Sequence, residues 1–229
     1  MVYNPHSWLA SVVLALLLTA AIGLLFLNIL TSAFTRIGFS PSEAFVLLMT
    51  SLLASSINIP VGRVKARIVQ DRTILAYGVL YRIPDPSPRE NSTVVGVNAG
   101  GAIIPIALSA YLLARFSSAV PMALIALVVV ALAVNRVAKP VPGLGIVIPA
   151  LWPPVVAALT TTSLSSLMDG APEATFVTAY VSGTLGTLLG ADIFNLNRIK
   201  ELGAPIASIG GAGTFDGIFL TGLMAVLLI

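Results

Sequence analysis

Residues 8–34 read WLASVVLALLLTAAIGLLFLNILTSAF, an uncharged run in which almost every side chain is apolar. The hydrocarbon core of a bilayer is about 30 Å thick, and an α-helix needs roughly 20 apolar residues to cross it. This run therefore predicts a transmembrane helix. The alternative is a secretory signal peptide, but the run is longer than the apolar region of such peptides and no Lys or Arg precedes it.

Six further apolar runs follow, each bounded by charges, Pro or Gly. Together with the first they predict seven spans, at approximately 8–34, 41–59, 92–114, 119–135, 144–167, 174–196 and 211–229. The second span begins at Ser40-Pro41-Ser42-Glu43, a capping box with Pro at the first helical position. We therefore predict an all-α polytopic membrane protein with about seven transmembrane helices, some of them broken by Gly or Pro, in one membrane domain over residues 1–229.

The composition agrees with this prediction. Of 229 residues, 57% are hydrophobic and 9% are charged, whereas about a quarter of an ordinary soluble chain is charged. There is no cysteine, and the single histidine, His6, excludes a His-based zinc site or a Ser-His triad within one chain. We expect no metal and no cofactor. The expected partner is the lipid bilayer; oligomers are possible, and nucleic acid is not expected.

The basic residues predict the orientation, because Lys and Arg are enriched in cytoplasmic loops. Two of them, Arg36 and Arg115, fall on one side of the predicted spans. The other side receives Arg63, Lys65, Arg67, Arg72, Arg82, Arg89, Arg136, Lys139, Arg198 and Lys200. We therefore expect a protein of the cell membrane with a cytoplasmic N-terminus and, after seven spans, a C-terminus outside.

The stretch from Pro60 to Glu90 is the only sizeable polar segment between spans. Residues 63–68 alternate charged with apolar side chains, residues 70–72 form a polar break, and residues 73–81 are rich in β-forming residues. This pattern predicts a small cytoplasmic β-hairpin inserted between the second and third spans. Residues 84–88, with three prolines, predict a stiff linker into the third span.

Two aspartates lie in or near predicted spans, where ionisable residues are costly and usually functional. Asp192 lies near the cytoplasmic end of the sixth span, and Asp216 lies in the first turns of the seventh. Neighbouring antiparallel helices can bring these carboxylates close together, so that they share one proton. Such a pair suits acid/base hydrolysis and equally suits proton or cation translocation. The structural alternatives are a helix cap for Asp216 and an interfacial position beside Arg198 for Asp192.

Glycine opens each span that enters the membrane from the cytoplasmic side after the hairpin. The three segments are Asn98-Ala99-Gly100-Gly101-Ala102, Pro142-Gly143-Leu144-Gly145 and Gly210-Gly211-Ala212-Gly213. Broken backbone at membrane depth is tolerated where it is buried in protein or lines a cavity, so these segments predict a shared polar pocket. The predicted substrate-binding residues are Asn98, Gly100, Gly101, Gly211, Gly213 and Asn195.

Close helix packing is the alternative explanation for glycines in these segments. It is the interpretation we favour for Gly183, Gly186 and Gly190, because their spacing places them along the sixth span at near-helical intervals. The Gly-Gly-Ala sequence at residues 100–102 recurs at residues 210–212, which suggests an internal repeat.

Four segments resemble a prokaryotic family of multi-pass membrane proteins of unknown function: SINIP (56–60), VNAGGA (97–102), GTLGTLLGAD (183–192) and SIGGAGTFDGIFL (208–220). A more distant resemblance is to intramembrane aspartic proteases of the presenilin and signal-peptide-peptidase type. In those proteases one catalytic Asp lies on an inward span and the other on the next outward span, in a Gly-x-Gly-Asp motif near a Pro-Ala-Leu motif. Here two residues separate Gly213 from Asp216, and Pro149-Ala150-Leu151 precedes both aspartates.

The resemblance implies a membrane-embedded aspartic hydrolase of peptide bonds, with Asp192 and Asp216 alternating as base and acid. Glycine-rich backbone would let an extended substrate strand approach, and the hairpin could pair with that strand. One alternative is a small transporter or channel that binds a proton or cation at the same carboxylates. Another is a non-catalytic subunit of a membrane complex.

Overall fold

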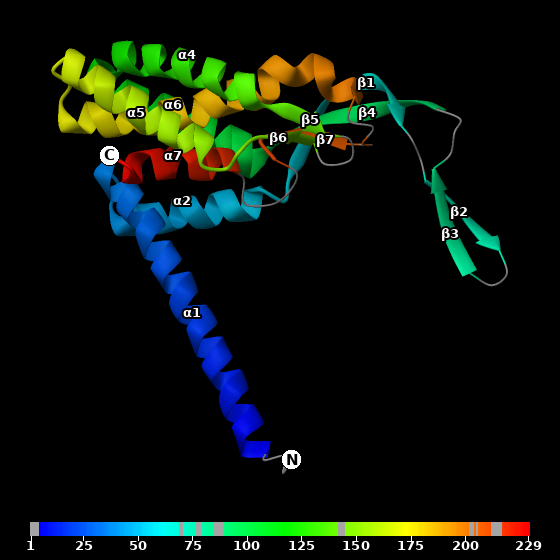
Figure 1. Ribbon diagram of the computed structural model, residues 1–229. Helices are drawn as coiled ribbons and strands as arrows, with labels where there is room; N and C mark the ends of the chain where they lie inside the picture. The colour runs from blue at the N-terminus through cyan, green and yellow to red at the C-terminus, as the bar shows by residue number, and fades with distance from the viewer. Residues whose placement is uncertain are drawn as a thin grey trace.

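The computed structural model describes residues 5–68, 71–76, 79–84, 89–141, 145–201, 204, 206–211 and 217–229 (Figure 1). Most of this part of the chain is helical. Its α-helices are α1 (Pro5–Arg36), α2 (Pro41–Ala54), α3 (Ile104–Arg115), α4 (Val120–Val137), α5 (Trp152–Leu167), α6 (Pro172–Thr187) and α7 (Gly217–Leu227). Each predicted span thus contains one of these helices.

Three helical stretches are long and apolar enough to cross a membrane: Trp8–Arg36, Ser117–Val137 and Pro172–Ile199. The apolar helices Pro41–Ala54, Ala99–Arg115 and Gly217–Leu227 are shorter. The predicted start of α2 is confirmed, since the Ser40 hydroxyl accepts a hydrogen bond from the Glu43 N–H and a Glu43 carboxylate oxygen accepts one from the Ser40 N–H. The three long apolar helices therefore support a membrane protein, while seven crossings remain a prediction.

Several predicted spans begin or end as strand instead of helix. Residues 92–98, predicted as the start of the third span, belong to β4 (Arg89–Asn98), and residues 58–59, predicted as the end of the second, belong to β1 (Asn58–Ile68). The reason is local composition: residues 94–97 are Val-Val-Gly-Val, and β-branched residues lose little in a strand but crowd a helix.

The main sheet has three strands in the order β1-β4-β7, with β7 at Ile206–Ile209. β1 and β4 pair antiparallel from Asn58 opposite Asn98, and β4 and β7 pair parallel from Val94 beside Ile206. Two shorter pairs are antiparallel: β2 (Asp71–Ala76) with β3 (Val79–Pro84), and β5 (Lys139–Val141) with β6 (Gly145–Val147).

The predicted hairpin at residues 60–90 exists in part. A hairpin of β2 and β3 projects from the main sheet (Figure 1). The expected pairing of residues 63–68 with residues 73–81 is wrong, because 63–68 pair with 89–94 of β4 and the later stretch is divided between two six-residue strands. Of the predicted linker, residues 85–88 lie outside the described residues.

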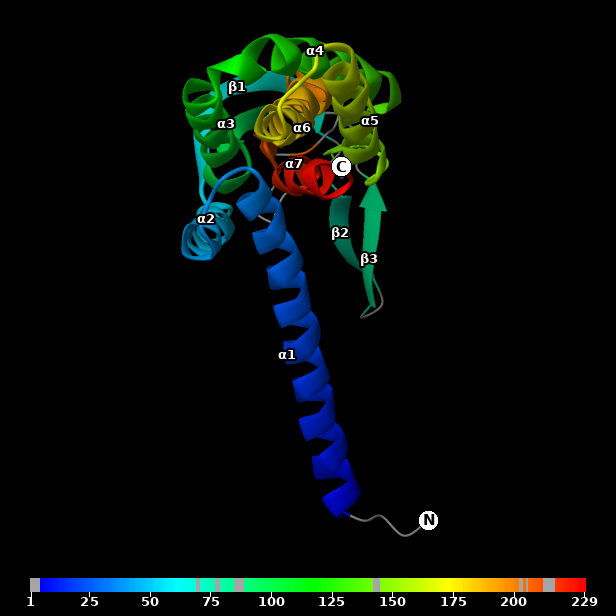
Figure 2. The same ribbon diagram turned by 90° about the vertical axis from the view of Figure 1, so that its left-hand side faces the viewer.

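Helix α6 forms the centre of the bundle, with α3, α4, α5 and α7 around it (Figure 2). The main sheet and the β5–β6 pair lie together at one end of these helices (Figure 1). Helix α1 leaves the bundle: its residues 8–26 are exposed, and only its last turns pack, through the buried Leu30, Ala33 and Phe34, against the core.

Gly183 and Gly186 of α6, and Gly190 in the π turn that follows it, serve helix packing, as predicted. A Cβ at Gly186 would lie 2.8 Å from the Val130 side chain of α4, and one at Gly190 would overlap the carbonyl of Ala131. A Cβ at Gly183 would lie 3.2 Å from the Cα of Gly222 on α7. The glycines therefore contact two neighbouring helices and do not form a single face.

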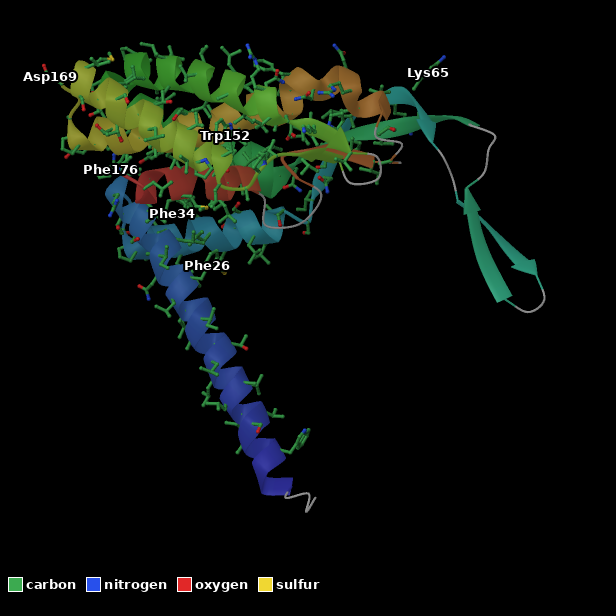
Figure 3. All side chains as sticks on the ribbon, viewed as in Figure 1. Phe26, Phe34, Lys65, Trp152, Asp169 and Phe176 are labelled. Atoms are coloured by element: carbon green, nitrogen blue, oxygen red, sulfur yellow. The ribbon has the colours of Figure 1, made fainter. Side chains whose placement is uncertain are left out.

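Charged residues mark the two ends of the bundle. Figure 3 places Lys65 at the sheet end, and Asp169 and Phe176 at the opposite end. At that opposite end the Arg36 guanidinium donates to the Val226 carbonyl over 3.2 Å and lies 5.6 Å from the centre of the Phe176 ring.

Candidate functional site

Asp192 lies where the central helix loses its regular form. It ends η3 (Leu188–Asp192), a π-helical turn that continues α6 and is followed by the 3₁₀-helix η4 (Ile193–Glu201). Its side chain is half-buried, and its Oδ2 accepts a hydrogen bond of 2.7 Å from the backbone N–H of Gly210. The carboxylate therefore ties the end of α6 to the segment that leads into α7.

Two asparagine amides stabilise the irregular turn before Asp192. A π turn changes the backbone pairing and leaves carbonyls in need of other donors. The buried Asn195 donates from Nδ2 to the carbonyls of Gly190 and Ala191, each over 3.0 Å, and Asn135 of α4 donates to Gly190 over 3.2 Å. Asn195 also accepts a bond of 3.3 Å from Arg198. Its amide thus has structural partners, and substrate binding by Asn195 stays a prediction.

Two of the predicted glycine-rich segments touch each other. Gly210, with φ of 84°, packs against η1 (Ala99–Ile103), the π turn that opens α3. A Cβ on Gly210 would lie 2.6 Å from the Cβ of Ala102 and 2.8 Å from the carbonyl carbon of Gly101. Only glycine allows both this backbone angle and this approach. The structure thus brings Gly101 to the segment that contains Gly210 and Gly211, beside Asp192.

Asn98 holds η1 in place. It is completely buried, and its Oδ1 accepts a 2.7 Å hydrogen bond from the Gly101 N–H. Its Nδ2 donates to the Ser55 carbonyl over 2.6 Å and to Asn58 Oδ1 over 3.2 Å. The same Asn58 oxygen accepts a bond from the Ser208 hydroxyl of β7. Asn98 therefore joins α2, β1 and β7 at the opening of α3.

Gly100 brings the same turn close to α2. The Ser51 hydroxyl donates to the Gly100 carbonyl over 2.8 Å, and a Cβ on Gly100 would overlap the backbone of Ser51 and Ser55. Packing against α2 therefore requires glycine at position 100. Substrate binding by Gly100 stays a prediction.

Strand β7 provides an extended backbone beside Asp192. It pairs with β4 along one edge, and in the described part of the chain no strand pairs with its other edge. Ile206, at its start, is 62% exposed. Because β7 ends at Ile209, the next residue is the Gly210 whose N–H binds Asp192. The open edge of β7 thus leads to the carboxylate.

The second predicted aspartate, Asp216, lies outside the described residues, as do Gly213 and residues 142–144. The distance between the two carboxylates therefore stays a prediction. Close by, Ile218 of α7 is buried in one cluster with Ala102 of η1 and Leu188 of η3. Among the residues that the structure describes, no group of three or more His, Cys, Asp or Glu side chains could hold a metal ion.

Two contributors to the site were not predicted from the sequence. The sequence shows Gly210 as part of a glycine-rich segment but does not identify it as the hydrogen-bond donor to Asp192, because a backbone N–H has no sequence signal. Asn135 did have a signal, since it is an isolated amide in the apolar helix α4.

The sequence model of one protein family matches residues 52–228; the family is described as "Protein of unknown function (DUF1614)". The match includes Asn98, Asp192, Gly210 and Asp216, and it begins one residue after Ser51. No curated protein and no solved structure matches the chain.

Proposed function

Since the chain belongs to this family of unknown function, its activity has to be inferred from the site, and we propose that it is an intramembrane aspartic hydrolase of peptide bonds. The observation that carries the proposal is the 2.7 Å hydrogen bond between Gly210 and Asp192. It places an ionisable side chain at the junction of two π turns, glycine-rich backbone and an open strand edge. Ionisable side chains within membrane-spanning segments are costly, and they are retained mainly for function.

The position of α7 supports a partnership between Asp192 and Asp216. Ile218 packs on Leu188, within the turn that Asp192 ends. In the sequence, Asp216 directly precedes Gly217, the first residue of α7. The pairing of Asp216 with Asp192 is therefore part of the proposal and stays a prediction.

In the proposed reaction the two carboxyl groups hold one proton between them. One carboxylate takes a proton from water while the water oxygen attacks the peptide carbonyl carbon. The other carboxyl group then gives its proton to the leaving nitrogen as the C–N bond breaks. The Gly210 N–H orients Asp192 for the first of these roles.

The substrate that fits this site is a polypeptide in extended form. Its backbone would add to the open edge of β7 and run toward Gly210 and Gly211, which have no side chains to block it. An extended strand exposes its peptide groups to the carboxylates, whereas an intact helix covers its own.

The membrane arrangement is part of the proposal. We infer seven crossings, with the sheet end of the bundle in the cytoplasm and the C-terminus outside the cell membrane. Helices α2 to α7 run in alternating directions between the two ends (Figure 1), and Arg63, Lys65, Arg136 and Lys139 all belong to the sheet end. This charge distribution is typical of a cytoplasmic face.

The test is cleavage of model transmembrane peptides by protein reconstituted in liposomes. We expect D192N and D216N each to abolish cleavage. The matched control is D169N, because Asp169 lies in the turn after α5 at the opposite end of the bundle, and its φ of 48° is one that Asn also adopts. Cleavage by D192N at the rate of the unmodified protein would contradict the proposal.

A proton- or cation-coupled transporter is the second candidate. It is favoured by the two π turns η1 and η3, because interrupted helices at ion sites are common in transporters. Flux measured in the same liposomes separates the two functions: loss of cation-driven flux in D192N, without peptide cleavage by the unmodified protein, would favour transport. A non-catalytic subunit is expected to show neither activity.

A further inference from the structure

Four hydroxyl groups on α6 are buried without hydrogen-bond partners in the described part of the chain, those of Thr178, Tyr180, Thr184 and Thr187. The last three, Tyr180, Thr184 and Thr187, have no exposed surface and lie on a different face of the helix from Thr178. The Thr184 hydroxyl is the hydrogen-bonding neighbour of the Tyr180 hydroxyl, and neither reaches any other partner in the described part of the chain. Buried polar groups are nearly always satisfied by protein or by water, so these three require an explanation.

These residues form one row along the helix. They are spaced by four and three residues, and at 100° per residue this spacing keeps them within about 60° on one face. We call Tyr180, Thr184 and Thr187 the hydroxyl row. The spacing of these residues therefore gives one face of α6 a buried stripe of hydroxyl groups.

The π turn adds Asp192 to the end of this row. Asp192 comes five residues after Thr187, and in a regular α-helix it would be turned away by about 140°. In η3 the Ile193 N–H bonds to the carbonyl of Leu188, five residues earlier. A turn of this width brings a residue back over the one five positions before it. The irregular turn thus aligns Asp192 with the hydroxyl row.

On the neighbouring helix α7, the residue that faces the hydroxyl row is Gly222. A Cβ on Gly222 of α7 would overlap the Thr184 hydroxyl oxygen and lie 3.0 Å from the Tyr180 carbonyl oxygen. Gly183 meets the same Gly222. The other α7 groups beside Gly183 are the Ala225 methyl group and the Thr221 carbonyl oxygen, so small groups form the α6–α7 contact at this point.

The row points toward the other end of the bundle. Phe176 lies one turn before Tyr180, is only partly buried, and is covered by the exposed Arg36 guanidinium at 5.6 Å. Figure 3 shows Phe176 at the end opposite the sheets. Beyond Tyr180 the row thus ends beneath a charged residue at the surface.

We propose that the hydroxyl row is a path by which water reaches Asp192 from the end of the bundle opposite the sheets. The path is closed in this structure by the contact of Gly222 with Thr184, and it opens when α7 moves away from α6. Water then supplies the missing hydrogen-bond partners of the three hydroxyls. The inference rests on the proposed function for the fate of that water, which hydrolysis consumes.

The absence of native cysteine allows a direct test in the full-length protein in liposomes. T184C and T187C place a thiol on the hydroxyl row. The matched control is A179C: Ala179 is equally buried, and it lies seven residues before Gly186, on the face toward α4. The measurement is the labelling rate with a small water-soluble methanethiosulfonate reagent.

We expect T184C and T187C to be labelled at least about tenfold faster than A179C, since local opening would expose only the α6–α7 contact. Equal labelling of all three thiols, or no labelling of T184C and T187C, would overturn the path. Labelling requires no activity, so it is independent of the hydrolase proposal. If D192N retains cleavage while T184C and T187C are labelled, the proposal of an Asp192-dependent hydrolase is contradicted and the proposal of a water path is still supported.

Two isosteric variants connect the path to the reaction. T184V and T187V remove the hydroxyls but keep the shape of the side chains. We expect at least a severalfold fall in kcat with unchanged KM, because water supply and not peptide binding is affected. An unchanged kcat in both variants would overturn the role of the path in hydrolysis.

Discussion

The backbone N–H of Gly210 donates a hydrogen bond to Asp192 Oδ2, while the Cα of Gly210 packs against Ala102 at the opening of α3. One residue thus fixes the carboxylate and the contact between two interrupted helices. Because Gly210 has a positive φ and no space for a side chain, its identity is required for both.

Substitution of Gly210 tests this relationship. We expect G210A to lower the free energy of unfolding by about 1–3 kcal/mol, since it combines backbone strain with a steric overlap. Cleavage should fall as well, because the N–H moves away from Asp192. The control is G23A in the exposed part of α1, where nothing lies within 4 Å of the new methyl group. Thermal unfolding in detergent measures both, and equal stability of G210A and G23A would contradict the packing described here.

Asn98 is expected to stabilise the fold independently of any role in catalysis. N98A leaves the Gly101 N–H and the Ser55 carbonyl without their partners. We expect a loss of about 1–3 kcal/mol in the free energy of unfolding. S56A removes an exposed hydroxyl that bonds only to Leu53 of its own turn, so its effect should stay within about 0.5 kcal/mol. A stable N98A would show that the buried amide network is dispensable.

The contact between α6 and α7 can be tested by a double-mutant cycle. G222A forces a methyl group onto the Thr184 hydroxyl, and we expect it to destabilise the protein by about 1–3 kcal/mol. T184A removes the obstructing oxygen, so the double variant G222A/T184A should recover at least about 0.5 kcal/mol of that loss. G217A, at the open start of α7, is the neutral control. Strictly additive effects of the two changes would contradict the contact.

The open edge of β7 is expected to receive the substrate. I206K adds a charge to that edge, and charges on edge strands prevent pairing with a further strand. We expect a severalfold increase in KM with little change in thermal stability. I59K is the matched control, since Ile59 is 46% exposed on β1, at the other edge of the same sheet. Equal KM values for I206K and I59K would exclude β7 as the docking edge.

The sequence locates the helices well because the apolar runs coincide with them, and the capping box at Ser40 defines one boundary to the residue. It does not separate helix from strand at residues 92–98, where a short apolar run of β-branched residues suits either structure. The parallel pairing of β4 with β7 joins residues far apart in the chain, and no local pattern indicates it.

For the candidate site too, the sequence predicts some of the residues but not the contacts between them. Asp192 and Asn98 are polar residues in apolar surroundings, so the sequence identifies them. The partners of these residues are largely backbone groups of Gly210, Gly101 and Ser55, and backbone groups are the same in every residue. The π turn that aligns Asp192 with Thr187 likewise depends on helix packing at Gly190 and on the amides that cap it.

The most direct test of the central claim compares peptide cleavage by D192N, D216N and the double variant D192N/D216N in liposomes. Residues that act as one catalytic unit have grossly non-additive effects. We predict that each single variant loses as much activity as the double variant. Losses that multiply in the double variant, or a single variant with full activity, would contradict a catalytic pair of Asp192 and Asp216.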